Sequence, residues 1–503
     1  MKTIKRYLKF VLPVVLTAVL AVACSSSKNE EGAFIPKDAY FVADINVGSL
    51  WQKGELTQAN DLNSIQMLHS FLAVSAPDFD KILEEMIKDP SSCGIDMNRN
   101  IAVFMSDNNG RSMAVVNAAL KDQKVFEDFL STVEKTAGGM KTAEEGGRKV
   151  TVFSNEFIAA YDETNVVFVF NADGKTDIES QKSYATTLYD LDKDNSMLAD
   201  KHYGEYKDLR HDINFYAPYA NLMKLTGGAA SMTQMQAFLP KEDFDAMQDA
   251  AICYSVSFEN GSIDVNGSYL GTPAGLQKIM DQKFNAKLVD YMPEQTLVAF
   301  TFAVSPSGLI DYLGNIPSLK PFLGNDTGYG SIKDIVTAFG GSFVASFYGM
   351  ENNTPLFAAA CDINNTELVS EMLEDMGLGT TGVIPGSPIK YILANGAFVI
   401  STDDAVITAA ANGGFGNGLN NIADKAKSGN YFYIDLKIQD YPEELVSQLG
   451  VLDPVATMLL GMLDFAEAYS DNTTTSTFKL HLANPNANSL AYTIQTIDQV
   501  AGI

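Results

Sequence analysis

The sequence is short of positive charge, with 35 lysine and arginine residues against 62 aspartate and glutamate residues in a chain of 503. The formal net charge at pH 7 is −27. Nucleic-acid backbones and anionic membrane surfaces are negatively charged, so a chain this acidic does not hold them by electrostatic attraction. We therefore expect no nucleic-acid partner, and any attachment to a membrane must rest on something other than basic residues.

Cysteine and histidine are also scarce, at four residues each. Beyond Cys24, near the N-terminus, the three remaining cysteines are an odd number and cannot form a complete set of internal disulfides, although a single bridge is left open. The histidines are scattered, and none has metal-ligand spacing to a cysteine or to another histidine. We expect no metal site and no cofactor. The residues concerned are Cys93, Cys253 and Cys361, and His69, His202, His211 and His481.

The N-terminus carries the pattern of a lipoprotein signal peptide. Four basic residues among the first nine precede an apolar stretch, Phe10 to Ala23, which is shorter than the roughly 20 residues of a membrane-spanning helix. The stretch ends in Ala21-Val22-Ala23-Cys24, which resembles a bacterial lipobox, although Ala21 stands where leucine is favoured. An ordinary signal peptide is the alternative. We predict a signal peptide over residues 1–23, with Cys24 lipidated through its thiol and its new amino group. Several acyl chains, palmitate among them, would give a stable anchor.

Residues 24–34 are mostly polar and are predicted to form a flexible tether. Neither Ser25 nor Ser26 is an aspartate, so the usual signal for retention in the inner membrane is missing. The cluster Lys28-Asn29-Glu30-Glu31 resembles the charged signal that carries some Bacteroidota lipoproteins to the cell surface. We therefore expect a lipid anchor in the outer membrane with display on the cell surface, a periplasm-facing anchor being the alternative.

Beyond residue 34 the chain repeats itself once. A proline-led strand at Pro36–Ile45 recurs at Pro293–Phe302, and a strand, hairpin turn, strand and helix from Ile101 to Val133 recur from Phe343 to Met376. Further matches pair Val150–Phe153, Phe157–Tyr161 and Val166–Phe170 with Tyr391–Leu393, Ala397–Ser401 and Val406–Ala409, and Asn214–Tyr216 and Tyr254–Phe258 with Tyr431–Tyr433 and Phe478–Leu482. Because the matches keep one order, they predict a tandem duplication with repeats at 35–291 and 292–503.

Each repeat is expected to contain antiparallel hairpins with helices packed on one face, which is an α+β fold. Asp122 and Asn365 stand at the expected N-caps of the matching helices. Whether the two sheets join is left open. The apolar stripe predicted for the first of these helices consists of Val125, Phe126, Phe129, Leu130 and Val133.

The lipobox, the opening Ile35–Asn46 and the segment Asp212–Tyr216 together resemble one large family of Bacteroidota lipoproteins, of about this length, that is classed as a domain of unknown function. The likeness covers essentially the whole mature chain and rests on a diffuse pattern rather than a sharp motif. The resemblance implies a location in the cell envelope and a duplicated α+β fold. It brings no catalytic residues.

The segment His202–His211 and the residues that follow it hold half of the histidines and four tyrosines. Tyrosine combines a flat apolar face with a polar tip, which suits the recognition of a sugar or a peptide. The alternative is core packing, since Phe215 and Tyr216 lie in an expected strand and one of them has to face inward. Trp51, the only tryptophan, is expected to pack at the end of the first strand. The candidate ligand-binding residues are Tyr203, Tyr206, Arg210, His211 and Tyr219.

Two other segments resemble known sites without completing them. Asp190–Asn195 alternates carboxylates as a calcium loop does, but Asn195 replaces the glycine, and Lys201 replaces the bidentate glutamate. Asn412–Gly418 is rich in glycine but has neither the lysine nor the spacing of a phosphate-binding loop. We interpret the first as an acidic loop and the second as a turn, and we predict no catalytic residue.

These patterns predict a non-enzymatic binding or structural ectodomain in the cell envelope, with an unknown protein or glycan as its ligand. The alternative is an envelope hydrolase whose site is assembled between the two repeats. A binding protein predicts a concave or cleft surface between the two repeats that is lined with tyrosines, whereas an enzyme predicts a pocket with clustered titratable groups of perturbed pKa. The sequence alone indicates neither the ligand nor a reaction.

Overall fold

The computed structural model describes residues 30–225, 233, 235–236, 238–271, 274–448, 454–470 and 474–501. The predicted signal peptide, Cys24 and the first part of the predicted tether lie outside these residues. Within them, no helix combines the length and the apolar character needed to cross a membrane. The chain divides into two compact units. The first comprises the residues up to Gly228, Ala251–Ile263 and the residues from Asn486 on, and the second comprises Ala229–Ala250 and Asp264–Pro485.

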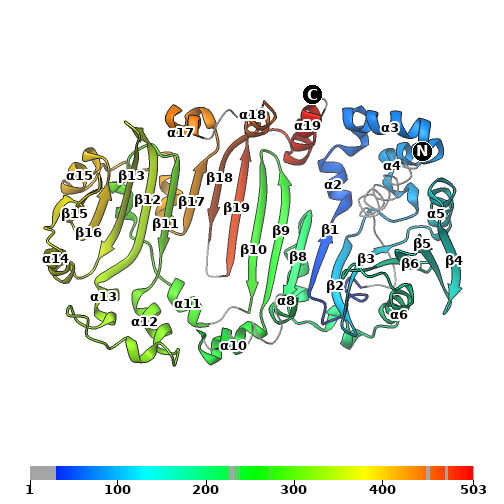
Figure 1. The fold of residues 1–503 in the computed structure, drawn as a ribbon, viewed down its shortest axis with the longest axis horizontal. Helices are drawn as coiled ribbons and strands as arrows, with labels where there is room; N and C mark the ends of the chain where they lie inside the picture. The colour runs from blue at the N-terminus through cyan, green and yellow to red at the C-terminus, as the bar shows by residue number, and fades with distance from the viewer. Residues whose placement is uncertain are drawn as a thin grey trace. The chain divides into compact units, whose positions relative to one another are not determined.

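Both units consist of antiparallel strands with helices packed against them, so the predicted α+β fold is confirmed (Figure 1). In the first unit the strands pair in the order β4-β5-β6-β7-β3-β2-β1-β8-β9. Their bounds are β1 Phe41–Ile45, β2 Ile101–Asn108, β3 Arg111–Ala119, β4 Met140–Glu145, β5 Arg148–Phe153, β6 Phe157–Tyr161, β7 Asn165–Asn171, β8 Ile213–Pro218 and β9 Ala251–Glu259.

The helices of the first unit gather around this sheet, and the C-terminal helix α19, drawn red, lies beside α2 and α3 although it is far away in sequence (Figure 1). The α-helices are α2 Val47–Lys53, α3 Asn63–Ser75, α4 Pro77–Lys88, α5 Gln123–Ala137, α6 Ile178–Tyr189, α7 Tyr203–Asp208, α8 Tyr219–Leu225 and α19 Ser489–Ala501. The short 3-10 helices are η1 Leu56–Asp61, η2 Pro90–Cys93, η3 Lys193–Asn195 and η4 Met197–Ala199.

The helix α5 shows how local signals and packing agree. The Asp122 carboxylate accepts a hydrogen bond from the Val125 backbone N–H at 3.0 Å, which confirms the predicted N-cap. Phe126, Phe129, Leu130 and Val133 are buried against the sheet in the main core of the unit. Val125 is an exception to the predicted stripe, because it is exposed on the first turn of the helix.

In the second unit the strands pair in the order β14-β15-β16-β13-β12-β11-β17-β18-β19-β10. The strands are β10 Ser262–Leu270, β11 Val298–Ala303, β12 Phe339–Glu351, β13 Thr354–Ile363, β14 Thr381–Val383, β15 Lys390–Ala394, β16 Ala397–Ser401, β17 Tyr431–Asp435, β18 Leu463–Tyr469 and β19 Thr475–Leu482. The helices are α10 Lys241–Gln248, α11 Ala274–Met280, η5 Ala286–Tyr291, α12 Pro306–Gly314, η6 Lys320–Phe322, α13 Ile332–Ala338, α14 Thr366–Asp375, α15 Asp404–Ala411, α16 Ala423–Ser428, η7 Ile438–Asp440, α17 Glu443–Gln448 and α18 Pro454–Leu460.

The two units share a pairing order. The run β6-β7-β3-β2-β1-β8-β9 of the first unit corresponds to β15-β16-β13-β12-β11-β17-β18 of the second, and α15 packs on β15 and β16 as α6 packs on β6 and β7. By this order Ala397–Ser401 corresponds to β7 and not, as predicted, to Phe157–Tyr161, and β9 corresponds to β18 rather than to Phe478–Leu482. The repeat boundaries at 35–291 and 292–503 stay a prediction.

The predicted strand at Val406–Ala409 is wrong, because these residues lie in α15. The Asp403 carboxylate caps this helix by accepting a hydrogen bond from the Ala405 backbone N–H at 2.8 Å. A run of alanines follows, and alanine has the highest helix propensity of all residues. The local cap and the alanines outweigh the β-branched Val406 and Ile407.

The predicted tether ends earlier than its assigned limit at residue 34. Phe34 is buried, and its ring meets that of Tyr189 edge to face with the centroids 5.1 Å apart. The Glu31 carboxylate pairs with Arg210 at 2.6 Å. The chain is therefore fixed to the first unit from Glu31 onward.

Candidate functional site

The sequence-predicted ligand residues Tyr203 and Tyr206 lie in the interior of the first unit. Each is 1% exposed, and their rings contact each other and the ring of Tyr216 at centroid distances of 5.0 to 5.5 Å. The Tyr206 hydroxyl donates a hydrogen bond to the Asp44 carboxylate at 2.7 Å. The faces of these rings are used in packing, as the alternative interpretation of this segment anticipated.

The other three predicted residues lie in different surroundings. Arg210 joins the tyrosine cluster and contacts both Glu31, at 2.6 Å, and Asp44, at 3.4 Å. Burial raises the pKa of Asp44, against the lowering effects of Arg210 and the Tyr206 hydroxyl. His211 is exposed and Tyr219 is half-buried at the start of α8. A ligand-binding role for these five residues stays a prediction.

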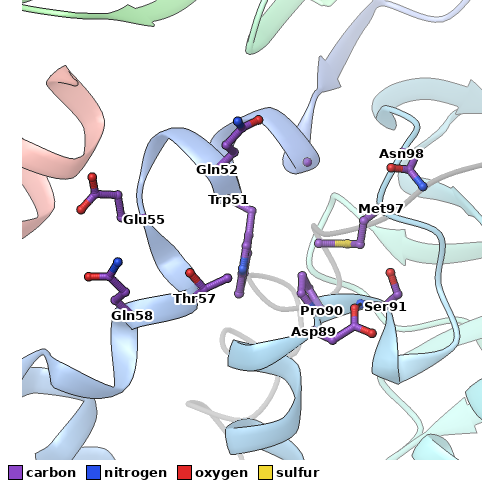
Figure 2. A pocket seen from close by; sticks show the side chains of 11 residues that line it. Trp51, Gln52, Glu55, Thr57, Gln58, Asp89, Pro90, Ser91, Met97 and Asn98 are labelled. Carbon is purple, nitrogen blue, oxygen red and sulfur yellow. Dashed lines mark hydrogen bonds between the residues drawn. The ribbon is translucent and has the colours of Figure 1, made fainter.

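A hollow of about 410 Å³ opens elsewhere in the first unit, around Trp51. We call it the Trp51 hollow. Figure 2 shows the Trp51 ring standing between Thr57 on one side and Pro90 and Met97 on the other. None of the five predicted ligand residues lines it. The residues that line it come from α2, η1, η2 and the loop before β2, and they are Gly48, Trp51, Gln52, Glu55, Thr57, Gln58, Asp89, Pro90, Ser91, Met97 and Asn98.

The helix α2, which carries Trp51, is held by Asn46 at its start and by Asp212 along its length. The Asn46 side chain caps α2 by accepting a hydrogen bond from the Ser49 backbone N–H at 3.0 Å. The buried Asp212 carboxylate accepts hydrogen bonds from the Ser49 hydroxyl at 2.5 Å and from Lys53 at 2.7 Å. These contacts fix the position of Trp51 relative to the sheet, because Asp212 directly precedes β8.

A close approach of two backbones forms one wall of the hollow. A Cβ added at Gly48 would lie 2.6 Å from the Met97 carbonyl oxygen, closer than real Cβ atoms come. Only glycine therefore lets α2 sit this close to the loop before β2. On the same side, Asp89 caps η2 by accepting a hydrogen bond from the Ser91 backbone N–H at 2.9 Å, which positions Pro90 and Ser91.

The indole N–H of Trp51 is buried and has no hydrogen-bond partner among the described residues. A buried donor without a partner costs about 1–3 kcal/mol, so most buried donors in native proteins are paired. A ligand that brings an acceptor oxygen to Trp51 Nε1 would remove that cost. The indole of Trp51, a residue that lines the hollow, thus has an unmet requirement for an acceptor.

The remaining lining groups set the charge and polarity of the hollow. Among the described residues that line it, none is lysine, arginine or histidine, whereas Glu55 and Asp89 are carboxylates. The Asn98 side-chain amide donates to Asp96 at 3.1 Å, which leaves its carbonyl oxygen available. The lining therefore favours neutral or cationic ligands that carry several hydrogen-bonding groups.

A second, smaller hollow of about 220 Å³ adjoins the first and shares Glu55 and Gln58 with it. We call it the α19 hollow, because Ile494 and Gln495 of α19 form its far wall. Figure 2 shows Glu55 and Gln58 projecting from the α2–η1 corner on the side away from Pro90. The remaining lining residues are Gly54, Leu56, Ala59, Asp61 and Leu62.

The helix α19 is fixed beside this hollow by Asp498. The Asp498 carboxylate accepts hydrogen bonds from the backbone N–H groups of Asn63 and Ser64, both at 2.8 Å, and from the Ser64 hydroxyl at 2.7 Å. These contacts join the C-terminal segment to the start of α3. They thereby hold in place the wall of the α19 hollow that Ile494 and Gln495 form.

A family profile for a domain of unknown function, DUF4836, matches residues 32–381. The chain belongs to this family. The whole Trp51 hollow lies inside the matched segment, whereas Ile494 and Gln495 lie beyond it. The match confirms the expected membership of an uncharacterised family, and the bacterial group to which that family belongs stays a prediction.

Other comparisons add no functional information. No curated protein sequence matches the chain at a significant level. Two crystal forms of TP0453 are similar solved structures: form IV at 7% identity and a TM-score of 0.27 covers 48% of this chain and 81% of that one, and form III at 10% identity and 0.23 covers 77% and 99%. At these TM-scores the likeness supports no argument about fold or function.

The three cysteine thiols and the acidic loop Asp190–Asn195 have structural surroundings. Cys93, Cys253 and Cys361 are all free, and burial raises the pKa of Cys93 to about 11 and that of Cys253 to about 12, which keeps both thiols protonated and unreactive. In the acidic loop, Asp192 caps η3. Over the described part of the chain, no group of three or more histidine, cysteine, aspartate or glutamate side chains is placed to hold a metal ion.

Proposed function

We propose that the protein is a lipoprotein of the bacterial cell envelope, anchored in the outer membrane through Cys24, whose first unit binds a neutral or cationic polar ligand in the Trp51 hollow. The observation that carries the binding role is a hollow of about 410 Å³ lined by Trp51, whose indole N–H is buried and has no hydrogen-bond partner among the described residues. Ligand pockets commonly measure about 300–1,000 Å³ and combine an apolar wall with a few polar groups.

The two carboxylates of the hollow favour binding over catalysis. A carboxyl group that acts as a general acid near neutral pH needs apolar surroundings that keep its proton on. Glu55 and Asp89 are both exposed, and one Asp89 oxygen already caps η2. Both are therefore better suited to accept hydrogen bonds from a ligand than to transfer protons.

Because the chain is held to the first unit from Glu31 onward, only a short segment separates this unit from the proposed lipid on Cys24. Seven peptide units separate Cys24 from Glu31, which at about 3.5 Å per residue span at most about 25 Å. Arg210 and Lys193 hold the end of this segment through ion pairs with Glu31 and Glu30. A lipid on Cys24 would therefore keep the first unit close to the membrane.

The binding role is tested by the emission of Trp51, which is the only tryptophan and so reports on this hollow alone. Neutral oligosaccharides and neutral or basic tripeptides are titrated in turn, and we expect at least one set to change the emission saturably. Trp51→Phe should weaken that ligand at least tenfold in calorimetry, whereas Phe71→Ala, an exposed aromatic on α3, should leave affinity unchanged. If no probe alters the emission or the melting temperature, the binding role is wrong.

The anchor is tested separately by Cys24→Ser. We expect the wild-type chain in the outer-membrane fraction and the variant in the soluble fraction, because the variant has no lipid-bearing thiol. Ser25→Ala serves as the control and should stay with the membrane. Protease shaving of intact cells should release peptides from the wild type if it is displayed outside. Protection until the outer membrane is broken would overturn the surface display that Lys28-Asn29-Glu30-Glu31 indicates.

A further inference from the structure

We infer that the ligand of the Trp51 hollow is an oligosaccharide, neutral or amine-bearing, that places one sugar ring against Trp51 and the next in the α19 hollow. This inference rests on the proposed binding function and goes beyond it by naming the chemical class and the length of the ligand. It is carried by the lining chemistry, by the absence of an element that a peptide would use and by the adjacency of the two hollows.

The Trp51 hollow combines the two kinds of contact that a sugar ring requires. Trp51, Pro90 and Met97 supply an apolar wall against which the carbon face of a ring can lie. Around this wall stand polar side chains whose oxygen and nitrogen atoms can accept hydrogen bonds from sugar hydroxyls or donate to them. A hydroxyl oxygen would also meet the acceptor requirement of Trp51 Nε1 once the side chains that cover this atom move aside. The polar groups are Gln52, Thr57, Gln58, Asp89, Ser91 and Asn98.

Charge excludes acidic sugars and phosphorylated ligands. The two hollows contain three carboxylates, those of Glu55, Asp89 and Asp61, and none of the described residues that line them is basic. An anionic ligand would lose its hydration and meet like charge, with no cation to compensate. A neutral ring, or one that bears a protonated amine, has neither difficulty.

A peptide finds fewer of the features it needs. Extended peptides bind by adding a strand to an open sheet edge, helical peptides need an apolar groove, and proline-rich peptides need a groove lined with aromatic rings, whereas Trp51 is the one aromatic residue among those that line this hollow. The Trp51 hollow is bounded by α2, η1 and η2, whose backbone groups are largely engaged within those helices, and no strand edge lines it. Recognition has to come from side chains, which suits a ligand whose own polar groups are hydroxyls.

The two hollows together indicate a ligand longer than one ring. At about 410 Å³ the Trp51 hollow is within the size range of independent ligand sites, whereas the α19 hollow, at about 220 Å³, is below it. Glu55 and Gln58 line both hollows, so the two hollows adjoin at these side chains. Ile494 offers an apolar contact there, and Gln495 a hydrogen-bonding amide.

The test is a length series of gluco-, manno- and chito-oligosaccharides, from one to six units, titrated against the mature full-length chain by calorimetry and by Trp51 emission. We expect one series to bind, with affinity rising about tenfold from one unit to three and little beyond. Gln495→Ala should reduce that gain about threefold or more while leaving the single-unit affinity unchanged. Gln499→Ala, an exposed glutamine on the same helix outside both hollows, is the matched control and should change neither.

The outcomes separate this inference from the proposed function. If peptides change the Trp51 emission and no saccharide does, the binding function stands and the oligosaccharide inference is overturned. Binding of only anionic saccharides, or affinity that does not rise with length, also overturns it. If saccharides bind without any effect of Trp51→Phe, both the inference and the assigned site are wrong.

Discussion

At the scale of single residues, Glu55 holds a backbone conformation that glutamate seldom adopts. Its φ is 53° and its ψ is 33°, in the left-handed region, at the corner where α2 meets η1. Such a conformation costs a side chain with a Cβ roughly 1–2 kcal/mol, and such costs gather at functional sites. Because Glu55 lines both hollows, we interpret the cost as the consequence of keeping a carboxylate there.

We therefore predict opposite effects of Glu55→Gly on stability and on binding. The free energy of unfolding in urea should rise by about 1 kcal/mol, because glycine adopts positive φ without strain. Affinity for the oligosaccharide should fall several-fold, because the carboxylate is lost. Asn109→Gly relieves a positive φ in the β2–β3 turn, away from both hollows, and should leave affinity unchanged. A less stable Glu55→Gly variant with unchanged affinity would contradict this interpretation.

Glu467 in the second unit makes folding sensitive to acid. The side chain is almost fully buried, and burial by itself raises its pKa, but hydrogen bonds from His481, Lys425 and Tyr431 outweigh burial and hold the pKa at about 2. The nearest distances are 3.0 Å to His481, 2.5 Å to Lys425 and 3.0 Å to Tyr431. A carboxylate whose folded pKa is depressed stabilises the fold above its unfolded value, 4.5, and that contribution is lost as the pH falls toward 2.

We predict that Glu467→Gln is less stable than the wild type by a few kcal/mol at pH 7, because the charged hydrogen bonds of the network are weakened. The difference should shrink progressively as the pH falls below about 4.5, since the wild type then loses the same contribution. Urea unfolding at a series of pH values measures it. Glu371→Gln, an exposed glutamate on α14, is the control and should follow the wild type. A gap that stays constant from pH 6 to pH 3 would mean that Glu467 is not the group responsible.

At the scale of elements, Asp212 fixes α2 and hence Trp51. Its carboxylate is buried and accepts hydrogen bonds from the Ser49 hydroxyl, from Lys53 and from the Phe258 backbone N–H at 2.7 Å. It therefore links α2 both to β9 and to the segment that directly precedes β8. Removing its charge leaves the amine of Lys53 without that partner.

We predict that Asp212→Asn lowers the free energy of unfolding by about 2 kcal/mol, the size expected when a charged hydrogen bond in a part-buried pair is weakened. Because α2 then has less support, the emission maximum of Trp51 should also shift in the folded protein. Asp208→Asn, at the exposed end of α7, should change neither. An unshifted emission together with wild-type stability would show that α2 is held by its packing alone.

How far the elements could be predicted depends on how local their causes are. The strand–turn–strand–helix segments were predicted because their turns and the caps Asp122 and Asn365 act within a few residues. The strand assignment at Val406–Ala409 failed because similar hairpins with a left-handed asparagine, Asn155 and Asn395, occur at different places in the two units. Four strands lie between α5 and α6 but only three between α14 and α15, which displaced the match by one strand.

The Trp51 hollow could not be predicted, because its walls are about 40 residues apart in sequence and meet only in the fold. The sequence predicts only that Trp51, its single tryptophan, packs at the end of the first strand. It does pack partly against the core, but its indole N–H faces no partner. The composition of the tyrosine-rich segment indicates a binding surface, but Tyr203 and Tyr206 are buried.

At the scale of the whole molecule, we propose a chain held near a membrane by its N-terminus, with a ligand site in the first of two similarly ordered units. The family match reaches from residue 32 to 381 and so spans parts of both units. The negative net charge of the chain and the carboxylates of the hollows both favour ligands that are not anionic. Lipid anchoring and carbohydrate binding are independent claims, and each can fail without the other.

The most direct test of the central claim is collisional quenching of Trp51 emission by acrylamide in the free, folded protein. We predict that acrylamide, a small neutral molecule, reaches the indole ring through the open hollow and quenches its emission strongly. Ser91→Phe should fill the hollow from the η2 side and reduce the quenching at least twofold, without loss of stability in urea. A blue-shifted emission that acrylamide does not quench in the wild type would show that Trp51 is sealed in the core and that the hollow receives no ligand.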